Sequence, residues 1–167
     1  LSSPLVVLPA QRLGTYLVIE GKWDRSGPWR FLIDTGANTT LVTPEFAKRY
    51  GVAQDPNVPA APINVLSADG RAVALPPTTI RRIELGDARF ENISARIYDC
   101  AALSAHLGVK IDGILGFPLF RETLLTLDYP RDRVVLAPNS PTTLIPGASV
   151  PFNNANKTPL ITVRLDD

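Results

Sequence analysis

The sequence of 167 residues contains no methionine, one cysteine and one histidine, and these shortages exclude several kinds of site. Cys100 alone cannot form an internal disulfide, and cysteine and histidine are too few to hold zinc. We therefore expect neither a metal nor a cofactor. His106 has no serine or cysteine motif around it that would complete a catalytic triad, so a surface or capping role is favoured.

An excess of charge of either sign is also lacking. The 17 Lys+Arg residues balance 16 Asp+Glu residues and leave a net charge of +1, which gives no reason to expect nucleic acid or anionic lipid as a partner. No apolar run approaches the ~18–20 residues of a membrane-spanning helix, so no membrane span is expected. With 45% hydrophobic residues, the chain is predicted to be one compact domain with a real core.

The absence of methionine also concerns the ends of the chain. A sequence that starts at Leu1 is expected to be an excised domain or a processed product. A removed signal peptide, which would favour an exported or periplasmic protein, is one explanation of this start, and trimming of the chain is another. The sequence leaves the compartment open.

Proline and glycine, by contrast, are abundant, and 16 prolines with 11 glycines leave little room for long helices. We expect two short helices, Pro44–Tyr50 with Thr43 as its N-cap, and Pro118–Thr123. Short β-branched or alternating runs lie between the turns, which is typical of an all-β sandwich or barrel. These runs are Leu5–Leu8, Tyr16–Glu20, Trp29–Ile33, Ala72–Leu75, Thr79–Leu85, Ile93–Tyr98, Leu124–Asp128 and Arg133–Leu136.

Two β-hairpins are predicted. The first joins Leu124–Asp128 to Arg133–Leu136 through a turn that contains Pro130. The second joins Ile63–Leu66 to Arg71–Leu75. Its tip consists of the small or polar residues Ser67, Ala68, Asp69 and Gly70, which suits a mobile cover better than a core element.

The C-terminal part of the chain has a different composition. We expect residues 1–140 to form one domain, and residues 141–167 to form a linker and the first strand of a second, similar domain. A shift of 146 positions places Phe152 on Val6 and Val163 on Leu17, a match of pattern and not of identity. The alternative is that these residues form a C-terminal strand of the first domain.

One motif points to chemistry. Asp34 follows the apolar run Phe31-Leu32-Ile33 and precedes Thr35 and Gly36. An ionisable side chain directly after a buried strand must be exposed or hydrogen-bonded, because unpaired burial is costly. Glycine lets the backbone approach closely at such a turn. By itself Asp-Thr-Gly is also compatible with an ordinary turn.

The order of motifs resembles that of the retropepsin-like aspartic proteases, the retroviral-type, single-lobe relatives of pepsin. Asp-Thr-Gly is followed by a glycine-tipped hairpin and then by Ile114-Leu115-Gly116, and the resemblance covers roughly Tyr16 to Leu136. It implies an acid-protease-type closed barrel in which Asp34 is catalytic. The hairpin Ile63–Leu75 would be a flap over a peptide or protein substrate. Ile114, Leu115 and Gly116 would pack beneath the active-site loop as structural support.

The resemblance also implies roles for the neighbours of Asp34. Thr35 would donate its hydroxyl hydrogen bond to the opposite loop of an aspartate dyad. Ala37, Asn38 and Thr39, together with Ser67, Ala68, Asp69 and Gly70 of the flap tip, would line the substrate cleft. Asn38 departs from the retroviral pattern, which has an acidic residue at this place.

Such a dyad needs two carboxylates that share one proton, because both cannot ionise cheaply when they lie close together. No other aspartate of the sequence is followed by Thr-Gly or Ser-Gly. The sequence therefore predicts an aspartic endopeptidase half-site that is active only as a homodimer or with a second lobe. The alternative is a non-catalytic peptide-binding or structural β-barrel domain of acid-protease fold.

Overall fold

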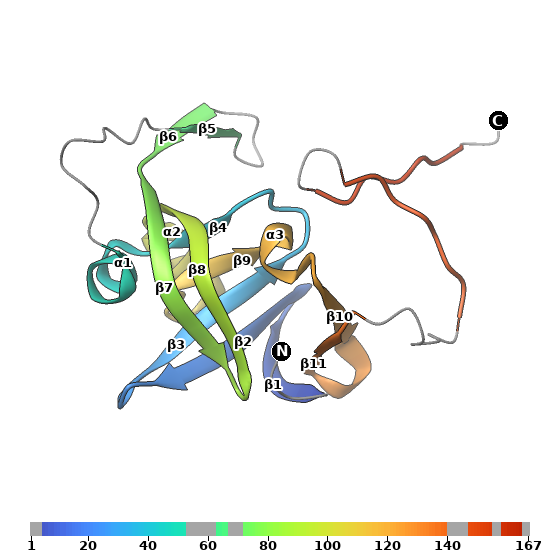
Figure 1. The fold of residues 1–167 in the computed structure, drawn as a ribbon, viewed down its shortest axis with the longest axis horizontal. Coiled ribbons are helices and arrows are strands. Elements are labelled where there is room, and N and C mark those ends of the chain that lie inside the picture. Colours follow the sequence, from blue (N-terminus) through green and yellow to red (C-terminus); the bar gives the residue numbers. More distant parts are fainter. Residues whose placement is uncertain (1–4, 53–62, 67–71, 140–146, 155–157, 165–167) are drawn as a thin grey trace.

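The computed structural model describes residues 5–52, 63–66, 72–139, 147–154 and 158–164. Within these ranges it contains strands in two sheets and a few short helices (Figure 1). The strands are β1 (Val6–Leu13), β2 (Tyr16–Trp23), β3 (Ser26–Asp34), β4 (Thr40–Val42), β5 (Ile63–Leu66), β6 (Ala72–Leu75), β7 (Pro77–Leu85), β8 (Ala88–Ile97), β9 (Gly113–Gly116), β10 (Thr123–Asp128) and β11 (Arg133–Pro138). The helices are α1 (Pro44–Tyr50), α2 (Ala101–Leu107), α3 (Phe117–Phe120) and the 3-10 turn η1 (Tyr129–Arg131). The fold is mostly β, as predicted.

Nine strands form one sheet in the order β10-β11-β1-β2-β3-β9-β4-β8-β7, and β5 and β6 form a separate pair. Neighbouring strands of the nine-stranded sheet are antiparallel, except that β3 is parallel to β9 and β4 is parallel to β8. Strand β9 lies between β3 and β4, although the chain connects β3 directly to β4. In the described part of the chain the edge strands β10 and β7 do not pair with each other, so the predicted closed barrel is not confirmed.

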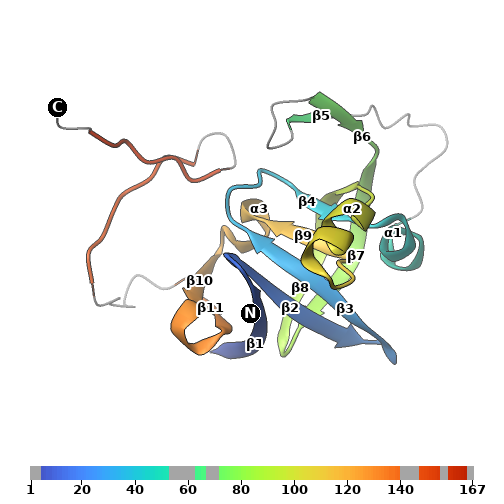
Figure 2. The same ribbon diagram turned by 180° about the vertical axis from the view of Figure 1, so that it is seen from behind.

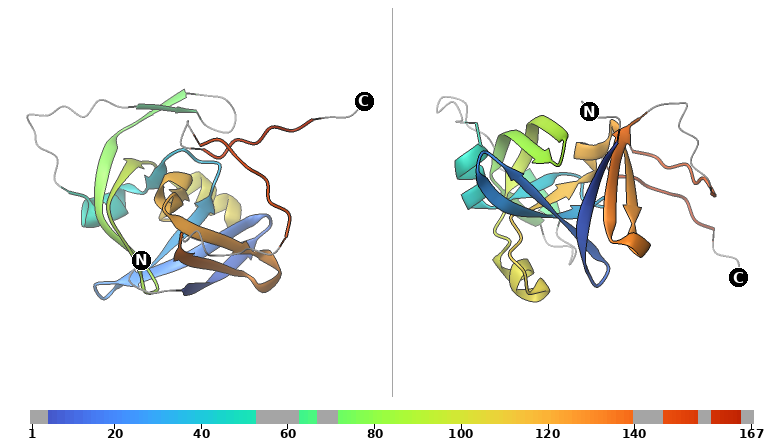
Figure 3. Two further views of the ribbon diagram at one scale, coloured as in Figure 1. Left: turned by 45° about the vertical axis from the view of Figure 1, so that its right-hand side comes forward. Right: turned by 90° about the horizontal axis from the view of Figure 1, so that it is seen from below.

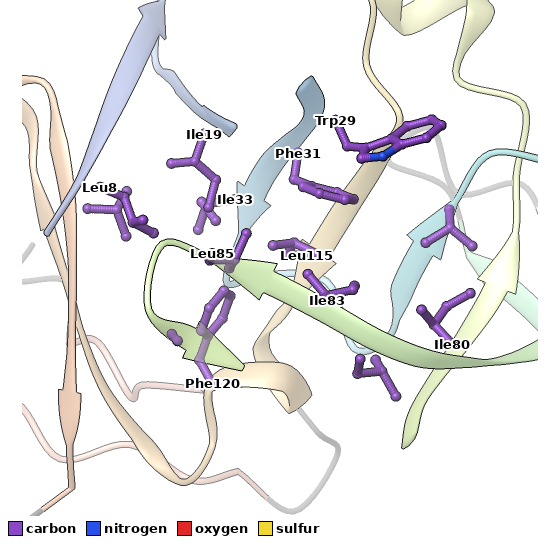
Figure 4. Packing of buried hydrophobic residues seen from close by; sticks show 14 of the residues in the cluster. Leu8, Ile19, Trp29, Phe31, Ile33, Ile80, Ile83, Leu85, Leu115 and Phe120 are labelled. Carbon is purple, nitrogen blue, oxygen red and sulfur yellow. The ribbon is translucent and has the colours of Figure 1, made fainter. Parts of the chain in front are cut away.

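The sheet buries its core by curling, so that inward-facing side chains from distant strands meet (Figure 4). Alternation makes this possible, because successive side chains of a strand point to opposite faces. In β7, for example, Ile83 and Leu85 are fully buried, whereas Glu84 between them is not, and the two meet Leu8, Ile19 and Leu115 within one cluster. A curled open sheet therefore encloses the core without closure by hydrogen bonds.

The first predicted helix is confirmed and the second is displaced. Helix α1 begins after Thr43, whose hydroxyl accepts a hydrogen bond from the Phe46 N–H at 3.4 Å. Helix α3 starts one residue before Pro118 and is shorter than predicted. Helix α2 was not predicted, so the expectation of one or two helices was wrong. None of its side chains is fully buried, but Leu103 and Leu107, four residues apart, pack against the cluster of Val18, Leu32, Cys100 and Ile111.

Both predicted hairpins have their strands in place. Strands β10 and β11 pair around η1, with Asp128 opposite Arg133. Strands β5 and β6 pair with Leu66 opposite Ala72. The predicted tip of the second hairpin, Ser67, Ala68, Asp69 and Gly70, lies outside the described residues.

The described tail residues 147–154 and 158–164 are not among the strands of the nine-stranded sheet. They run beside the domain as an extended segment (Figure 3), with one isolated bridge between Asn153 and Leu160. In the described part of the chain, none of the helices has the length and apolar character needed to cross a membrane.

Candidate active site

Asp34 is the last residue of β3 and lies opposite Gly116, the last residue of the parallel strand β9. Because parallel strands end at the same edge of a sheet, the ends of these two strands form one surface. Asp34 is exposed there, although Phe31, Leu32 and Ile33 before it are buried. The sequence thus delivers a carboxylate to solvent at the end of a core strand.

Hydrogen bonds within the motif hold the carboxylate. The Gly36 N–H donates to Asp34 Oδ1 at 2.9 Å, and the Ala37 N–H donates to the Asp34 carbonyl oxygen at 3.1 Å. A Cβ on Gly36 would lie 3.2 Å from the same Oδ1, a tight approach that glycine avoids. The turn therefore fixes the orientation of one carboxylate oxygen.

The end of β9 supports the same loop from below. The Phe117 N–H donates to the Ala37 carbonyl at 3.0 Å, and the Gly116 N–H donates to the buried Thr40 hydroxyl at 3.4 Å. A Cβ on Gly116 would stand 2.3 Å from the carbonyl oxygen of Thr39, a distance no side chain can adopt. The two segments can approach this closely only because Gly116 has no side chain.

The structure brings most of the residues predicted for the site to this edge. Thr35, Ala37 and Thr39 are partly buried in the loop, and Asn38 is exposed. Leu115 is fully buried in the main core, and Ile114 is partly buried against a second cluster. Ile114 and Leu115 thus sit below the loop, and the functional roles of the loop residues remain predictions.

The β5–β6 ribbon stands beyond the same end of the domain as the β3–β4 loop, and opposite views agree on this placement (Figures 1 and 2). Its described strands therefore lie on the side where a cover for the loop is expected. The predicted hairpin tip, residues 67–70, lies outside the described residues.

Two residues next to the site were not predicted. Thr40 is only 1% exposed, and its hydroxyl accepts the hydrogen bond from the Gly116 N–H. In the sequence it is one of two adjacent threonines, and nothing local distinguishes it. Gly113 begins β9, and a Cβ there would stand 2.6 Å from the Leu41 carbonyl oxygen. The spacing of Gly113 and Gly116 was the available signal, since two glycines in a four-residue strand indicate close backbone approach.

The opposite end of β9 carries a second aspartate in a different setting. Asp112 is 1% exposed, and its Oδ2 accepts a hydrogen bond from the Arg30 N–H at 2.9 Å. Its Oδ1 lies 3.1 Å from the Lys110 ammonium, which also donates to Glu45 at 2.8 Å. The bond to Glu45, and after it the contact with Asp112, raises the pKa of Lys110. Asp112 therefore has structural partners and lies away from Asp34, about 13 Å along the strand.

A cavity of about 800 Å³ opens near this second end, between the start of α1, helix α2 and residues 109–111. Cys100 lines it, and the thiol is 1% exposed. Burial, followed by the nearby charges of Asp99 and Asp112, raises the pKa of Cys100 to about 11. The thiol is thus protonated at neutral pH and is a poor nucleophile there.

Among the described residues, no group of three histidine, cysteine, aspartate or glutamate side chains could hold a metal ion. The only carboxylate of the described loop at residues 34–39 is that of Asp34. The chemistry that this arrangement offers by itself is a single, oriented and solvent-accessible carboxylate.

The profile of a family described as aspartyl protease matches residues 18–119 of this chain. A solved structure of a retropepsin-like aspartic protease from Rickettsia conorii has a similar fold, with a TM-score of 0.52 and 22% sequence identity. The similarity covers 79% of this chain and 89% of that one. No curated protein matches the chain. The matched region contains Asp34, the loop that orients it and the supporting strand β9, and the chain belongs to the aspartyl protease family.

Proposed function

We propose that this chain is one half of an aspartic endopeptidase, in which Asp34 forms a dyad with a second aspartate. The observation that carries the proposal is the placement of Asp34. An exposed carboxylate stands at the end of a buried strand, and the Gly36 N–H fixes its orientation. The motif lies within the region that matches the aspartyl protease profile.

The chemistry follows from the pairing of two carboxylates. When two such groups lie close together they share one proton and titrate as a pair. The ionised member takes a proton from a bound water, and the oxygen of that water attacks the scissile carbonyl carbon. The protonated member donates to the carbonyl oxygen, and transfer of a proton to the amide nitrogen then releases the amine. Asp34 can serve as either member.

The second carboxylate of the dyad would come from outside this chain's own Asp34 motif. Because Asp34-Thr35-Gly36 is the single motif of its kind in the sequence, the second aspartate belongs either to another copy of the chain or to a second lobe of the same polypeptide. Thr35 would then meet its counterpart across the axis that relates the two halves.

The proposed substrate is an extended segment of a peptide or protein. An extended peptide between the β3–β4 loop and the β5–β6 hairpin would pair its main chain with protein backbone, as in strand addition. Ala37, Asn38 and Thr39 would contact its side chains from the loop, and the hairpin tip at Ser67–Gly70 would contact them from above. Apolar pockets would then set the preference for particular peptides.

A peptide-library cleavage assay on the intact protein, at mildly acid and neutral pH, tests this function. Asp34→Asn should lower kcat/KM by about 1,000-fold, because it removes one partner of the proton transfer. Glu122→Gln is the matched control, since Glu122 is 85% exposed and lies outside the loop; it should leave the rate unchanged. Cleavage by Asp34→Asn at the wild-type rate would rule out the mechanism. Peptide binding without cleavage by the wild type would instead support a binding module.

A further inference from the structure

We propose that residues 147–164 are the first hairpin of a second copy of this fold in the same polypeptide, which supplies the partner aspartate in cis. This inference rests on the proposed function only for the role of that partner. Its structural part rests on four observations about the tail: the spacing of its bridge, its sequence, the faces of its side chains, and the place where it meets the domain.

The first observation is the spacing of the bridge. Asn153 pairs antiparallel with Leu160, and in the first hairpin of the domain Gln11 pairs antiparallel with Val18. Each pair is separated by the same number of residues, a spacing that Ile83 with Phe90 and Leu127 with Val134 also have. Alignment of the tail bridge with the first hairpin gives a displacement of 142 positions. The shift of 146 suggested by the strand pattern would place Leu160 on Gly14, within the turn itself, so we propose the register of the bridge.

The second observation is the sequence in this new register. Pro151 falls on Pro9, Ile161 on Ile19 and Asp166 on Asp24, so three positions are identical. Asn156 falls on Gly14, which has a φ of +63° at the turn. Asparagine is, after glycine, the residue that best tolerates the left-handed region. The residue type at this sequence position is therefore compatible with the backbone conformation of Gly14.

The third observation is the pattern of faces. Five apolar side chains of the tail are between 50% and 68% exposed: Val150, Phe152, Leu160, Ile161 and Val163. In the register of the bridge they fall on positions that are buried or partly buried in the first hairpin: Leu8, Ala10, Val18, Ile19 and Gly21. The polar residues Asn153, Asn154, Thr162 and Arg164 fall on the exposed positions Gln11, Arg12, Glu20 and Lys22.

Such agreement is what a hairpin without its own core would show. In a strand pair, the positions that face a core are apolar. A shift of the tail by one residue would no longer align its apolar residues with the buried positions of the first hairpin. The apolar side chains of the tail are exposed in this structure. Val150, Phe152, Ile161 and Val163 fall on the face that β1 and β2 turn to the main core, and Leu160 falls on Val18, which is buried on the opposite face. The missing cover is therefore the remainder of a second, similar sheet.

The fourth observation is the place of the tail. The ring of Phe152 packs edge-on against that of Phe117, with centroids 5.8 Å apart. Phe117 directly follows Gly116, the register partner of Asp34. A second unit that starts at this contact would begin beside the first half-site. Displaced by the same interval, its own Asp-Thr-Gly or Ser-Gly motif is expected about nine residues beyond Asp167.

The experiment uses the polypeptide that the complete reading frame encodes, with the variants Ile161→Asp and Thr162→Asp. Both introduce the same charge at adjacent positions, but only Ile161 falls on a buried position of the first hairpin. Calorimetry should show that Ile161→Asp removes the unfolding transition of the second unit, whereas Thr162→Asp leaves both transitions in place. Equal melting behaviour of the two variants would overturn the proposal.

Two further readouts separate the alternatives. Sedimentation of the wild type should show a monomer; a dimer that Ile161→Asp converts to monomer would overturn the proposal in favour of a hairpin that packs on a second copy. A reading frame without the second aspartate motif would overturn it as well. None of these measurements needs activity, so they test the second unit independently of the proposed function. If both units fold but Asp34→Asn leaves cleavage unaffected, only the proposed function is rejected.

Discussion

The two ends of the β3–β9 pair each carry an aspartate, and the two carboxylates have opposite environments. At one end Asp34 is exposed, and a hydrogen bond from the adjacent Gly36 holds it. At the other end Asp112 is 1% exposed and bonded to the Arg30 N–H and to Lys110. The same pair of strands thus presents one carboxylate to solvent and encloses the other.

This contrast shows how burial and partners assign different work to identical side chains. The buried carboxylate of Asp112 accepts a hydrogen bond at Oδ2 and forms an ion pair at Oδ1, and its removal would leave the Arg30 N–H without an acceptor. An exposed carboxylate at a strand end adds little stability and is free to meet a partner of like charge. Substitutions at the two ends should therefore separate stability from activity.

The largest expected effect belongs to Gly116→Ala, which attacks the supporting end of the exposed site. A Cβ at this position would stand 2.3 Å from the Thr39 carbonyl oxygen, so the loop or β9 must move. We expect a loss of about 3 kcal/mol in the free energy of unfolding and a loss of activity. Gly108→Ala is the control: nothing lies within 4 Å, and its φ of +70° should cost only about 1 kcal/mol. Equal losses in urea unfolding would contradict the close contact.

The next effect tests the contrast directly. Asp112→Ala leaves the Arg30 N–H without its acceptor and should lower the free energy of unfolding by about 2 kcal/mol. Asp34→Asn keeps an acceptor for the Gly36 N–H and should change it by less than about 0.5 kcal/mol. Urea unfolding of both variants measures the difference. A greater loss in Asp34→Asn would show that the exposed carboxylate is also structural.

A smaller effect concerns pH at the buried end. The pKa of Lys110 is raised by Glu45 and Asp112, so its ion pairs stabilise the folded state fully below the ordinary lysine value of 10.5. That contribution is lost as the pH rises through the higher pKa of the folded protein. The melting temperature of the wild type should therefore approach that of Lys110→Met above this pH. A difference that stays constant from pH 8 to 11.5 would contradict the assignment.

The smallest effect concerns the thiol near the buried end. With a pKa of about 11, Cys100 holds roughly 100-fold less thiolate at neutral pH than a thiol at 9.0, and burial also blocks access. Iodoacetamide should modify it readily in 6 M urea and at least ~100-fold more slowly in the native protein. Mass spectrometry over a time course measures both rates, and rapid native labelling would show that this end opens.

Much of the fold followed from local patterns. The runs that became β2, β7 and β11 were predicted within a few residues, and proline with a threonine N-cap located α1. Strands β4 and β9 were not predicted as strands. Strand β4 has only three residues, and β9 has four, two of which are glycines, so neither carries a periodic signal. Their pairing depends on contacts with segments far away in the chain.

The sequence predicted the motif of the candidate site and the supporting segment Ile114–Gly116, but not the other residues that hold the loop. Asp34-Thr35-Gly36 is a contiguous string, so a single sequence suffices to recognise it. Thr40 and Asp112 take their roles from partners some eighty residues distant, Gly116 and Arg30, and no local pattern encodes such pairs. The register proposed for the tail differs by four positions from the one predicted from the strand pattern, because a pattern of period two fits several shifts equally well.

The insertion of β9 between β3 and β4 has a consequence for synthesis of the protein. The loop that carries Asp34 is closed only when Gly113–Gly116, made some eighty residues later, slides between strands that are already present. Contacts of such long sequence separation form slowly, because the intervening chain must lose its freedom first. A nascent chain that still ends before Gly113 therefore lacks the parallel partner of β3 and the hydrogen bonds that Gly116 and Phe117 give to the loop region.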